Sequence, residues 1–453
     1  MMNALTQYLD LYREHCSLLD SRSARPLNEL RPRAAAVLEK MTLPPLGSEN
    51  YHITDLQKLL APDFGLNIAR VPIDVNPLRS FHCGVPAVST AQIFVLNDIC
   101  VRPEGANLPD PDSGVYIGSL AEAAEKMPHI VSEYYGRLAD IDNPIVALDT
   151  LLCQDGVMVY VPDGVRLERP LQIVNILQNG APLMAVRRLL VVLGHGAEAT
   201  ILTCDHTQNP EVDFASLQTI EVFAGDDSRL DIYDLEESTR RTTRLSALYL
   251  RQGARSNVLI DGCTLFNGNT RNEYHCRLAG EEGTLRLLGM AIEDDDRRAD
   301  TYSVIRHEVP RCNADELFKY VVDDRAAGCF GGLIYVAPGA VKTEAYQSNR
   351  NLVGSPQARM YSKPQLEIYN DDVKCSHGTA TGTLDEMQIF YMRSRGLSLP
   401  QARLLLKQAF MADVIDGVRM PGLKERLIKL VERRFAGHDA SCAACHAECD
   451  KQF

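Results

Sequence analysis

The sequence predicts a mainly β fold, with a β-helix or β-solenoid as its core between two helical regions. Apolar residues with helical spacing are confined to the segments before Asn143 and after Thr383. Between them, short runs rich in Val, Ile, Leu and Tyr alternate with Asp-Gly, Asn-Gly and Gly-Ala turn signals. Four of these strand-rich units also align as a weak internal repeat. Together these observations indicate many short strands flanked by helices.

The internal repeat aligns Gly196, Gly225, Gly253 and Gly280, which recur at a nearly constant interval. Each unit reads as a strand, a glycine-led turn and a second strand. Such a period is typical of stacked coils that bury a face only against their neighbours, as in a β-helix. A β-sandwich built from regular hairpins would give a similar pattern, so the repeat alone leaves both architectures open.

The N-terminal part, residues 1–142, is expected to form a mainly helical domain. Leu5, Tyr8, Leu9, Tyr12, Cys16 and Leu19 lie three or four residues apart and define one apolar helical face. Further helices are expected in residues 34–41, 53–60 and 118–136, the last of them disturbed at Pro128. The β-helix core is expected over residues 143–382, with the strand pattern beginning at Leu148.

A C-terminal helical domain is expected over residues 383–437. Thr383 and Glu386 match a capping box for a first helix that ends before Gly396, and Ser398 with Gln401 starts a second that ends at Gly417. A third helix follows in residues 423–435. These helices could either cover the last coil of the core or dock a partner. The second helix places in its interior Ala402, Leu405, Leu406, Ala409, Phe410, Ala412, Val414 and Ile415.

Composition excludes several classes of function. The 453 residues are 45% hydrophobic, enough for two or three domains with substantial cores, and the net charge of −13 disfavours binding to nucleic-acid phosphates. No apolar run reaches the length of a membrane span, and Asp10 and Glu14 interrupt the segment where an export signal needs apolar residues. We therefore expect a cytoplasmic protein with reduced cysteines and without nucleic-acid or membrane partners.

The strongest candidate for a metal-binding site is the pair Cys375 and His377. Two residues apart on a strand, their side chains leave the same face and could bind one soft or borderline metal, while Lys374 projects to the other face. Such a pair is also common in ordinary packing. The phosphate-binding loop of ATPases and the usual hydrolase and zinc-protease motifs are absent from the sequence.

A second candidate metal site is the Cys-rich tail, residues 438–453. Its thiols and imidazole could bind zinc or an iron-sulfur cluster, although a thiol-rich tail without metal is an equally simple interpretation. The candidate ligands are Cys442, Cys445, His446 and Cys449.

The C-terminal run SKPQLEIYNDDVKCSHGTATGTLDEMQIFYMRSRGLSLPQARLLLKQAFMADVID resembles the signature of the SufB/SufD family of iron-sulfur cluster assembly proteins. The segments ENYHITDL, NPIVALDTLLCQDGVMVYVPDGVRLERPLQIVN, LFKYVV and QSNRNLV also resemble family positions, so the likeness extends from about residue 45 to residue 435. The DDVKCSHG stretch is similar to the SufD branch. The resemblance implies a right-handed parallel β-helix flanked by helical domains.

The resemblance also implies a function and partners. The chain would be a non-catalytic scaffold subunit that pairs with a SufB-like subunit and a SufC-like ATPase. His377 and the neighbouring Cys375 would lie at the SufB interface and bind iron or a transient iron-sulfur cluster, with no permanently bound cofactor. The SufC-docking region would comprise Phe390, Tyr391, Arg393, Arg395, Gly396, Leu405, Ala409 and Phe410.

Several alternatives stay open at this stage. A β-helix could also belong to a polysaccharide-active enzyme, although the absence of Trp disfavours a sugar-binding groove. A stand-alone metal-binding or redox protein could work through the terminal cysteines. The sequence leaves undecided whether the isolated chain forms a homodimer, which cluster type is built and whether a flavin binds.

Overall fold

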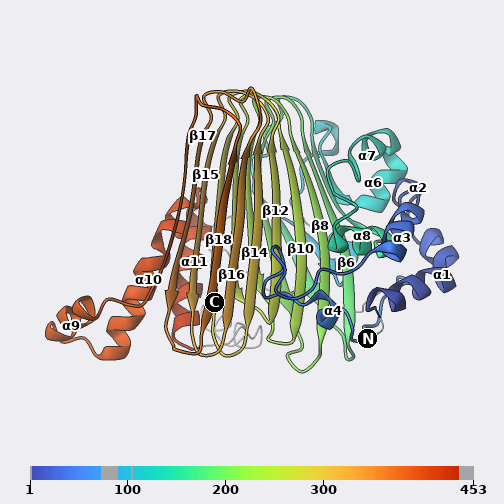
Figure 1. Cartoon of the computed structure of the whole chain (residues 1–453). Coiled ribbons are helices and arrows are strands. Elements are labelled where there is room, and N and C mark those ends of the chain that lie inside the picture. Colours follow the sequence, from blue (N-terminus) through green and yellow to red (C-terminus); the bar gives the residue numbers. More distant parts are fainter. Residues whose placement is uncertain (1–2, 73–89, 104–105, 438–453) are drawn as a thin grey trace.

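The computed structural model describes residues 3–72, 90–103 and 106–437 and has a parallel β-solenoid at its centre (Figure 1). Two sheets face each other, and the chain passes from one to the other with each successive strand from β4 onward. The ten-stranded sheet, called sheet 1 here, has the order β19-β17-β15-β13-β11-β9-β7-β5-β1-β2. The nine-stranded sheet, called sheet 2, has the order β18-β16-β14-β12-β10-β8-β6-β4-β3.

The strands from β6 onward are long and similar in length. Sheet 1 contains β1 (Ala91–Leu96), β2 (Ile99–Val101), β5 (Leu171–Leu177), β7 (Glu198–Thr207), β9 (Arg229–Glu237), β11 (Asn257–Phe266), β13 (Thr284–Glu293), β15 (Asn313–Val322), β17 (Glu344–Val353) and β19 (Lys374–Gly382). Sheet 2 contains β3 (Tyr116–Ser119), β4 (Gly156–Val161), β6 (Leu183–Leu193), β8 (Phe214–Ala224), β10 (Thr242–Gln252), β12 (Asn269–Leu278), β14 (Arg298–His307), β16 (Ala327–Val336) and β18 (Arg359–Ile368).

Parallel, in-register pairing between successive coils confirms the β-solenoid and excludes the sandwich of hairpins. The repeat is real, but its alignment needs correction. Strand register makes Gly194 rather than Gly196 equivalent to Gly225, and Ala279 rather than Gly280 equivalent to Gly253. A Cβ at Gly225 would lie 2.7 Å from the carbonyl carbon of Gly194, so a glycine is needed where successive turns stack backbone on backbone.

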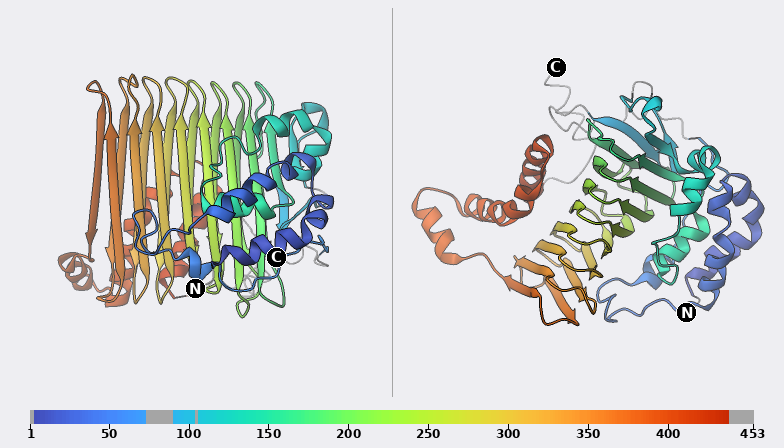
Figure 2. Two further views of the ribbon diagram at one scale, coloured as in Figure 1. Left: turned by 45° about the vertical axis from the view of Figure 1, so that its right-hand side comes forward. Right: turned by 90° about the horizontal axis from the view of Figure 1, so that it is seen from above.

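The N-terminal helices cover the outer face of sheet 2 (Figure 2). The helix predicted over residues 118–136 is two helices separated at Met127, because Pro128 begins a new one. The strand pattern predicted from Leu148 is wrong up to Leu152, where a buried helix capped by Asn143 packs on sheet 2. The helical elements are α1 (Leu5–Ser21), α2 (Arg25–Asn28), α3 (Arg31–Lys40), α4 (Leu56–Leu59), η1 (Pro111–Ser113), α6 (Leu120–Lys126), α7 (Pro128–Tyr134) and α8 (Pro144–Leu152).

The C-terminal helices are α9 (Glu386–Ser394), α10 (Leu399–Gly417) and α11 (Pro421–Phe435). The capping box predicted for α9 is wrong, because Asp385 is the N-cap and accepts a hydrogen bond from the Met387 amide. The capping box of Ser398 and Gln401 is confirmed for α10. The interpretation of these helices as a cap on the last coil is also wrong. The second half of α10 and all of α11 pack on the outer face of sheet 1, beside β9, β11, β13 and β15 (Figure 2).

Burial along the strands follows this coverage. β6, β8 and β10 are buried on both faces because side chains fill the solenoid on one side and helices cover the other. Farther along the stack β17 alternates between buried and exposed positions, and β19 is exposed at every position except the half-buried Cys375. The stack therefore ends in a coil with little cover of its own.

The acidic segment from Glu293 to Asp300 connects β13 to β14 and holds the end of a C-terminal helix. Glu293 and Asp300 are buried, and Asp294 accepts hydrogen bonds from the buried guanidinium of Arg434, which also donates to the Leu265 carbonyl at 2.7 Å. This contact fixes the end of α11 to sheet 1. Among the described residues, no helix is both long and apolar enough to cross a membrane.

Asp261 provides a test of helix packing on sheet 1. Its fully buried side chain lies on the outer face of β11 between Leu259 and Cys263, which pack against α10 and α11, and burial raises the pKa of this carboxyl from 3.8 to about 7. The folded chain therefore keeps the proton up to about pH 7, whereas the unfolded chain releases it near pH 4. Stability of the wild type should fall as the pH rises between these values and should not fall further above them from this cause.

The side chain of the Asp261→Asn variant cannot titrate, so we expect this variant not to lose stability in this pH range from residue 261. Between pH 5 and pH 8 its free energy of unfolding should rise relative to wild type by about 2–3 kcal/mol, from about 1.4 kcal/mol per pH unit. Denaturant unfolding of both proteins at each pH measures this difference. The contributions of all carboxyls that the two proteins share cancel when their free energies are subtracted. A difference that does not change with pH would contradict the buried neutral carboxyl.

Candidate functional site

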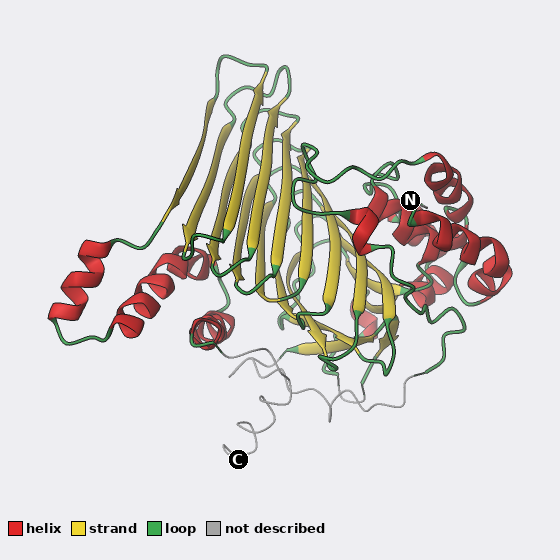
Figure 3. Cartoon of the chain, turned by 60° about the horizontal axis from the view of Figure 1, so that its bottom comes forward, coloured by secondary structure: helices red, strands yellow, loops and turns green. Residues whose placement is uncertain are grey.

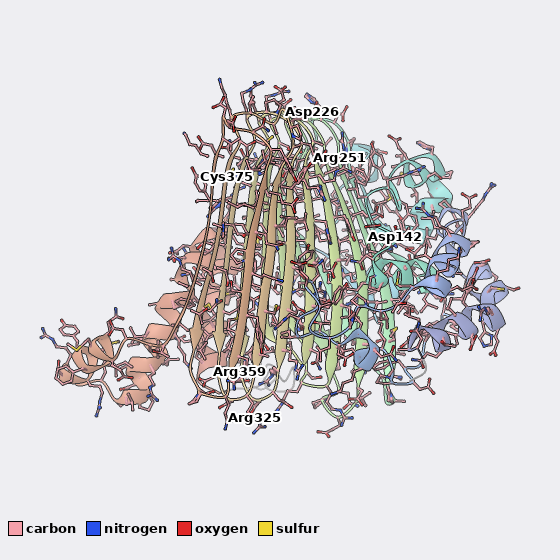
Figure 4. The ribbon with its side chains drawn as sticks, in the orientation of Figure 1. Asp142, Asp226, Arg251, Arg325, Arg359 and Cys375 are labelled. Carbon is pink, nitrogen blue, oxygen red and sulfur yellow. The ribbon has the colours of Figure 1, made fainter. Side chains whose placement is uncertain are left out.

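The candidate site lies at the open end of the solenoid, on β19. This strand pairs only with β17 in sheet 1, and β18 pairs only with β16 in sheet 2, so in the described chain each leaves one row of backbone groups unpaired. Figure 4 shows Cys375 near the turns marked by Asp226, away from Arg325 and Arg359 at the opposite edge.

Cys375 and His377 occupy the inward-facing positions of β19. Cys375 pairs in register with the buried Ala345, packs against the solenoid core and is half-buried; burial raises the pKa of its thiol. His377 lies two residues on, in register with Gln347, and its side chain is exposed because no further coil covers it. Lys374 projects to the outer face and pairs with Glu344 at 2.8 Å.

Polar side chains surround His377 inside the last coils. The Thr379 hydroxyl bonds the Ser362 hydroxyl across the two sheets at 2.8 Å, and Asn351 donates to Thr381 at 3.0 Å. One coil deeper, the Gln347 amide nitrogen donates to Glu316 at 2.7 Å, and burial raises the pKa of the Glu316 carboxyl to about 7. On β17 and β19 the open end is therefore lined largely by hydrogen-bonding groups, whereas Met360 and Leu366 of β18 contribute apolar side chains.

A second exposed feature is one face of α9, formed by Met387, Phe390 and Tyr391. These residues are 73%, 68% and 59% exposed and lie at helical spacings of three and four. Large apolar side chains in such a cluster are typical of a protein-binding surface. Figure 3 shows α9 standing away from the solenoid, beyond the end of β19.

The other residues predicted to dock a partner fall into two environments. Arg393 and Arg395 are exposed, the Arg395 guanidinium lies 5.3 Å from the centre of the Tyr391 ring, and Gly396 ends the helix with a φ of +95°. Leu405 and Ala409 are exposed on α10. Phe410 is half-buried, with its ring 4.7 Å from the Lys319 ammonium of β15, so it contributes to anchoring α10 on the solenoid.

The anchored half of α10 is held by buried apolar side chains and by charged contacts. Met411, Val414 and Ile415 pack against sheet 1. The Lys319 ammonium donates to the Phe410 carbonyl at 2.6 Å and to Asp413, while Lys407 pairs with Asp323 at 2.9 Å. The helix is therefore fixed to the solenoid at one end and exposed at the other. The prediction that Leu405 and Ala409 lie in its interior is wrong, and Met411 takes that role.

The predicted ligands of the tail, Cys442, Cys445, His446 and Cys449, lie outside the described residues. Within residues 3–72, 90–103 and 106–437 there is no group of three or more His, Cys, Asp or Glu side chains arranged to hold a metal ion. Nine cysteines of this part are free thiols, six of them buried, in agreement with the expected reduced state.

A groove of about 740 Å³ lies on the outer face of sheet 2 and bears on the polysaccharide-active alternative. Its floor carries Tyr249 stacked on His275 at 4.6 Å. Asp140, Asp142, Glu273 and Glu308 contribute its carboxylates, and the two glutamates are paired with arginines. Glu273 binds Arg271 at 2.7 Å, and Glu308 binds Arg277 at 2.8 Å. This pairing suits Glu273 and Glu308 poorly to the acid and base roles of glycoside hydrolysis.

Sequence reasoning missed three contributors to the site. Met387 could have been found from its spacing to Phe390 and Tyr391. Gln347 and Glu316 could not, because their relation to His377 depends on strand register across three coils.

Comparison with known protein families identifies the family of this chain. Residues 2–173 match the model of the SufBD protein N-terminal region, and residues 176–410 match that of the SUF system FeS cluster assembly, SufBD core domain. The chain therefore belongs to the SufBD family of iron-sulfur cluster assembly proteins.

Curated relatives add detail within the family. The SufD iron-sulfur cluster assembly protein of Escherichia coli is 28% identical over 446 residues, which cover 96% of this chain and 97% of that protein. An iron-sulfur cluster assembly SufBD family protein of Synechocystis sp. is 28% identical over 412 residues, with 89% and 90% coverage. SufD of Bacillus subtilis is 25% identical over 328 residues, with 71% and 74% coverage.

The two halves of α10 should respond differently to truncation. Met411→Ala removes a fully buried side chain and should lower the free energy of unfolding by about 2–5 kcal/mol. Leu405→Ala, the matched control on the same helix, removes an exposed side chain and should change it by less than about 0.5 kcal/mol. Denaturant unfolding measures both. Equal losses would contradict the division of the helix into anchored and free halves.

Proposed function

We propose that this chain is a SufD-like, non-catalytic scaffold subunit of a SufBCD complex that assembles iron-sulfur clusters. The observation that carries the proposal is the exposed His377 on the inward-facing side of the terminal strand β19, whose outer edge is unpaired among the described residues. Membership of the SufBD family and the likeness to SufD proteins support the same assignment.

The partner at the open coil would be a SufB-like subunit. An unpaired strand edge offers a row of backbone donors and acceptors that a strand of another chain can satisfy. His377 and Cys375 supply two donor side chains, and a nascent cluster needs further thiolate ligands, which a SufB cysteine would provide. A second copy of this chain could occupy the same edge when SufB is absent.

His377 would bind iron of the nascent cluster, which is the cargo of the complex rather than a permanent cofactor. Imidazole binds iron less strongly than a second thiolate would, so a mixed thiolate and imidazole site can hold iron and still release a finished cluster. The exposed position of His377 leaves it accessible from the SufB side.

The α9 face and Leu405 would dock a SufC-like ATPase. Only residues 383–385 separate the end of β19 from the start of α9, so a force on α9 acts almost directly on the strand that carries His377. The anchored half of α10 holds the other end of this helical arm against β15. ATP-driven movement of docked SufC subunits would thereby open the seam between SufB and this chain.

We expect His377→Ala to leave the three-subunit complex intact and to abolish cluster formation. The side chain is exposed, so its loss should not affect folding, but it removes the proposed iron ligand. Co-purification with the SufB-like and SufC-like subunits tests assembly, and anaerobic reconstitution followed by absorption spectroscopy tests cluster yield. Lys374→Ala, on the outer face of the same strand, is the control. Full cluster yield with His377→Ala would refute the role.

Docking of the ATPase should depend on the α9 face. Phe390→Ala should weaken binding of the SufC-like subunit by roughly 30-fold, the effect of losing an aromatic hot spot of about 2 kcal/mol. Calorimetric titration of the SufC-like subunit into the full chain measures this change. Ile428→Ala removes another exposed apolar side chain, from α11, and should leave the affinity unchanged. Equal affinity of Phe390→Ala and wild type would remove α9 from the interface.

A further inference from the structure

A column of three polar side chains runs through the last coils and ends at His377. Glu316 of β15, Gln347 of β17 and His377 of β19 are in register with one another. All three share the inward-facing side of sheet 1, since Ala314, Ala345 and Cys375, two residues before each of them, pack in the solenoid core. Neighbouring strands are about 4.8 Å apart, so side chains at registered inward positions stack on one another.

The side-chain amide of Gln347, the middle residue of the column, is hydrogen-bonded at one end only. Its side chain is 2% exposed, and its amide nitrogen donates to the Glu316 carboxylate at 2.7 Å, toward β15. Its amide oxygen Oε1 is buried and has no hydrogen-bond partner. Because the nitrogen is held by Glu316, the oxygen is the end of the amide left for the β19 side, where His377 is the registered neighbour. A buried acceptor without a donor is costly, so a donor is expected there.

Sheet 2 has a glycine, and so no side chain, where the Gln347 amide lies. Gly332 of β16 faces it, and a Cβ at position 332 would lie 2.3 Å from the Gln347 amide nitrogen and 2.9 Å from its amide carbon. Any larger residue would displace the amide or force it to rotate. Glu316 and Gly332 together therefore fix where the amide lies and which way it faces.

We propose that Gln347 is a positioning residue for His377, accepting a hydrogen bond at Oε1 from one ring N–H of the imidazole. A neutral imidazole has one N–H donor and one nitrogen lone pair, so this bond selects the tautomer and holds the ring plane. The lone pair then points away from Gln347, toward the open end of the solenoid. Histidine ligands commonly have their second ring nitrogen held in this way. As an account of iron binding, the inference rests on the function proposed above.

The tautomer of His377 tests this role without iron or partners. Ring-nitrogen chemical shifts of the full chain, labelled with ¹⁵N-histidine and measured at pH 8, distinguish the two tautomers, and loss of one signal set in His377→Ala gives the assignment. We expect one dominant tautomer in the wild type and a mixture of both in Gln347→Met, which keeps the length of the side chain but removes the acceptor. An unchanged single tautomer in Gln347→Met would overturn the proposal.

Two further variants separate positioning from a general effect on the fold. Asn351→Leu removes another buried amide on the same inward face of β17, one that bonds Thr381 of β19 rather than His377, and should leave the His377 tautomer unchanged. Glu316→Gln keeps the shape of residue 316 but can donate as well as accept, so the Gln347 amide is free to turn; it should give a mixed tautomer. If Gln347→Met fails to fold, as judged by circular dichroism, Glu316→Gln carries the test, and a single tautomer there overturns the proposal.

Cluster assembly in the reconstituted complex gives a second measurement. Loss of such a supporting contact should slow cluster formation by about 10- to 100-fold in Gln347→Met, with Asn351→Leu close to wild type. The two proposals fail in different ways. Normal cluster yield with His377→Ala refutes the iron-binding role, whereas an unchanged tautomer in Gln347→Met refutes the positioning role even if His377 is essential.

Discussion

Backbone pairing between successive coils is the constraint on which the rest of this structure depends. Each parallel strand forms backbone hydrogen bonds with the strands on both sides, and the side chains of each coil are covered by the next coil. A stack of this kind is complete everywhere except at its ends. At the N-terminal end β2 and β3 close the two sheets with antiparallel pairs. At the other end β18 and β19 leave their backbone edges and inward-facing side chains uncovered, which is where the candidate ligands lie.

The helices divide the outer surface so that this end stays accessible. N-terminal helices cover sheet 2 over its first coils, and α11 with the second half of α10 covers sheet 1 over the middle coils. The buried contacts of Lys319 and Arg434 hold the C-terminal helices at the sides of the stack. As a result the chain separates a largely buried middle from an exposed end that carries β19 and the helix joined to it.

Much of the fold could be predicted from the sequence because its signals are local. Turn glycines, runs of β-branched residues and the capping box of Ser398 each act within a few residues. The errors have equally local causes. α8 is as apolar as a strand because it is buried on all sides. The first and fourth units of the repeat are misaligned because glycine also occurs in those turns at positions other than the stacked one, as at Gly196 and Gly280.

The candidate site was only partly accessible to such reasoning. Cys375 and His377 could be found from their spacing, whereas Phe390 and Tyr391 of the α9 face followed only from the family resemblance. The column of Glu316, Gln347 and His377 could not, because it is set by the register between strands about thirty residues apart, which no local pattern encodes. The packing of α10 on β15 depends in the same way on Lys319, whose role appears only when the two elements meet.

On the inward face of sheet 1, two registered positions become more polar toward the open end. At one registered position Phe318 of β15 is followed by Asn349 and then Thr379; at the next, Tyr320 is followed by Asn351 and then Thr381. Aromatic rings suit a coil that others cover, whereas amides and hydroxyls can bond to water when the chain is alone and to a partner when it is bound. An apolar interior exposed in this way would favour non-specific association. The polar side chains of sheet 1 therefore reduce the apolar area exposed at the end and leave the imidazole of His377 in surroundings whose hydrogen bonds can fix its orientation.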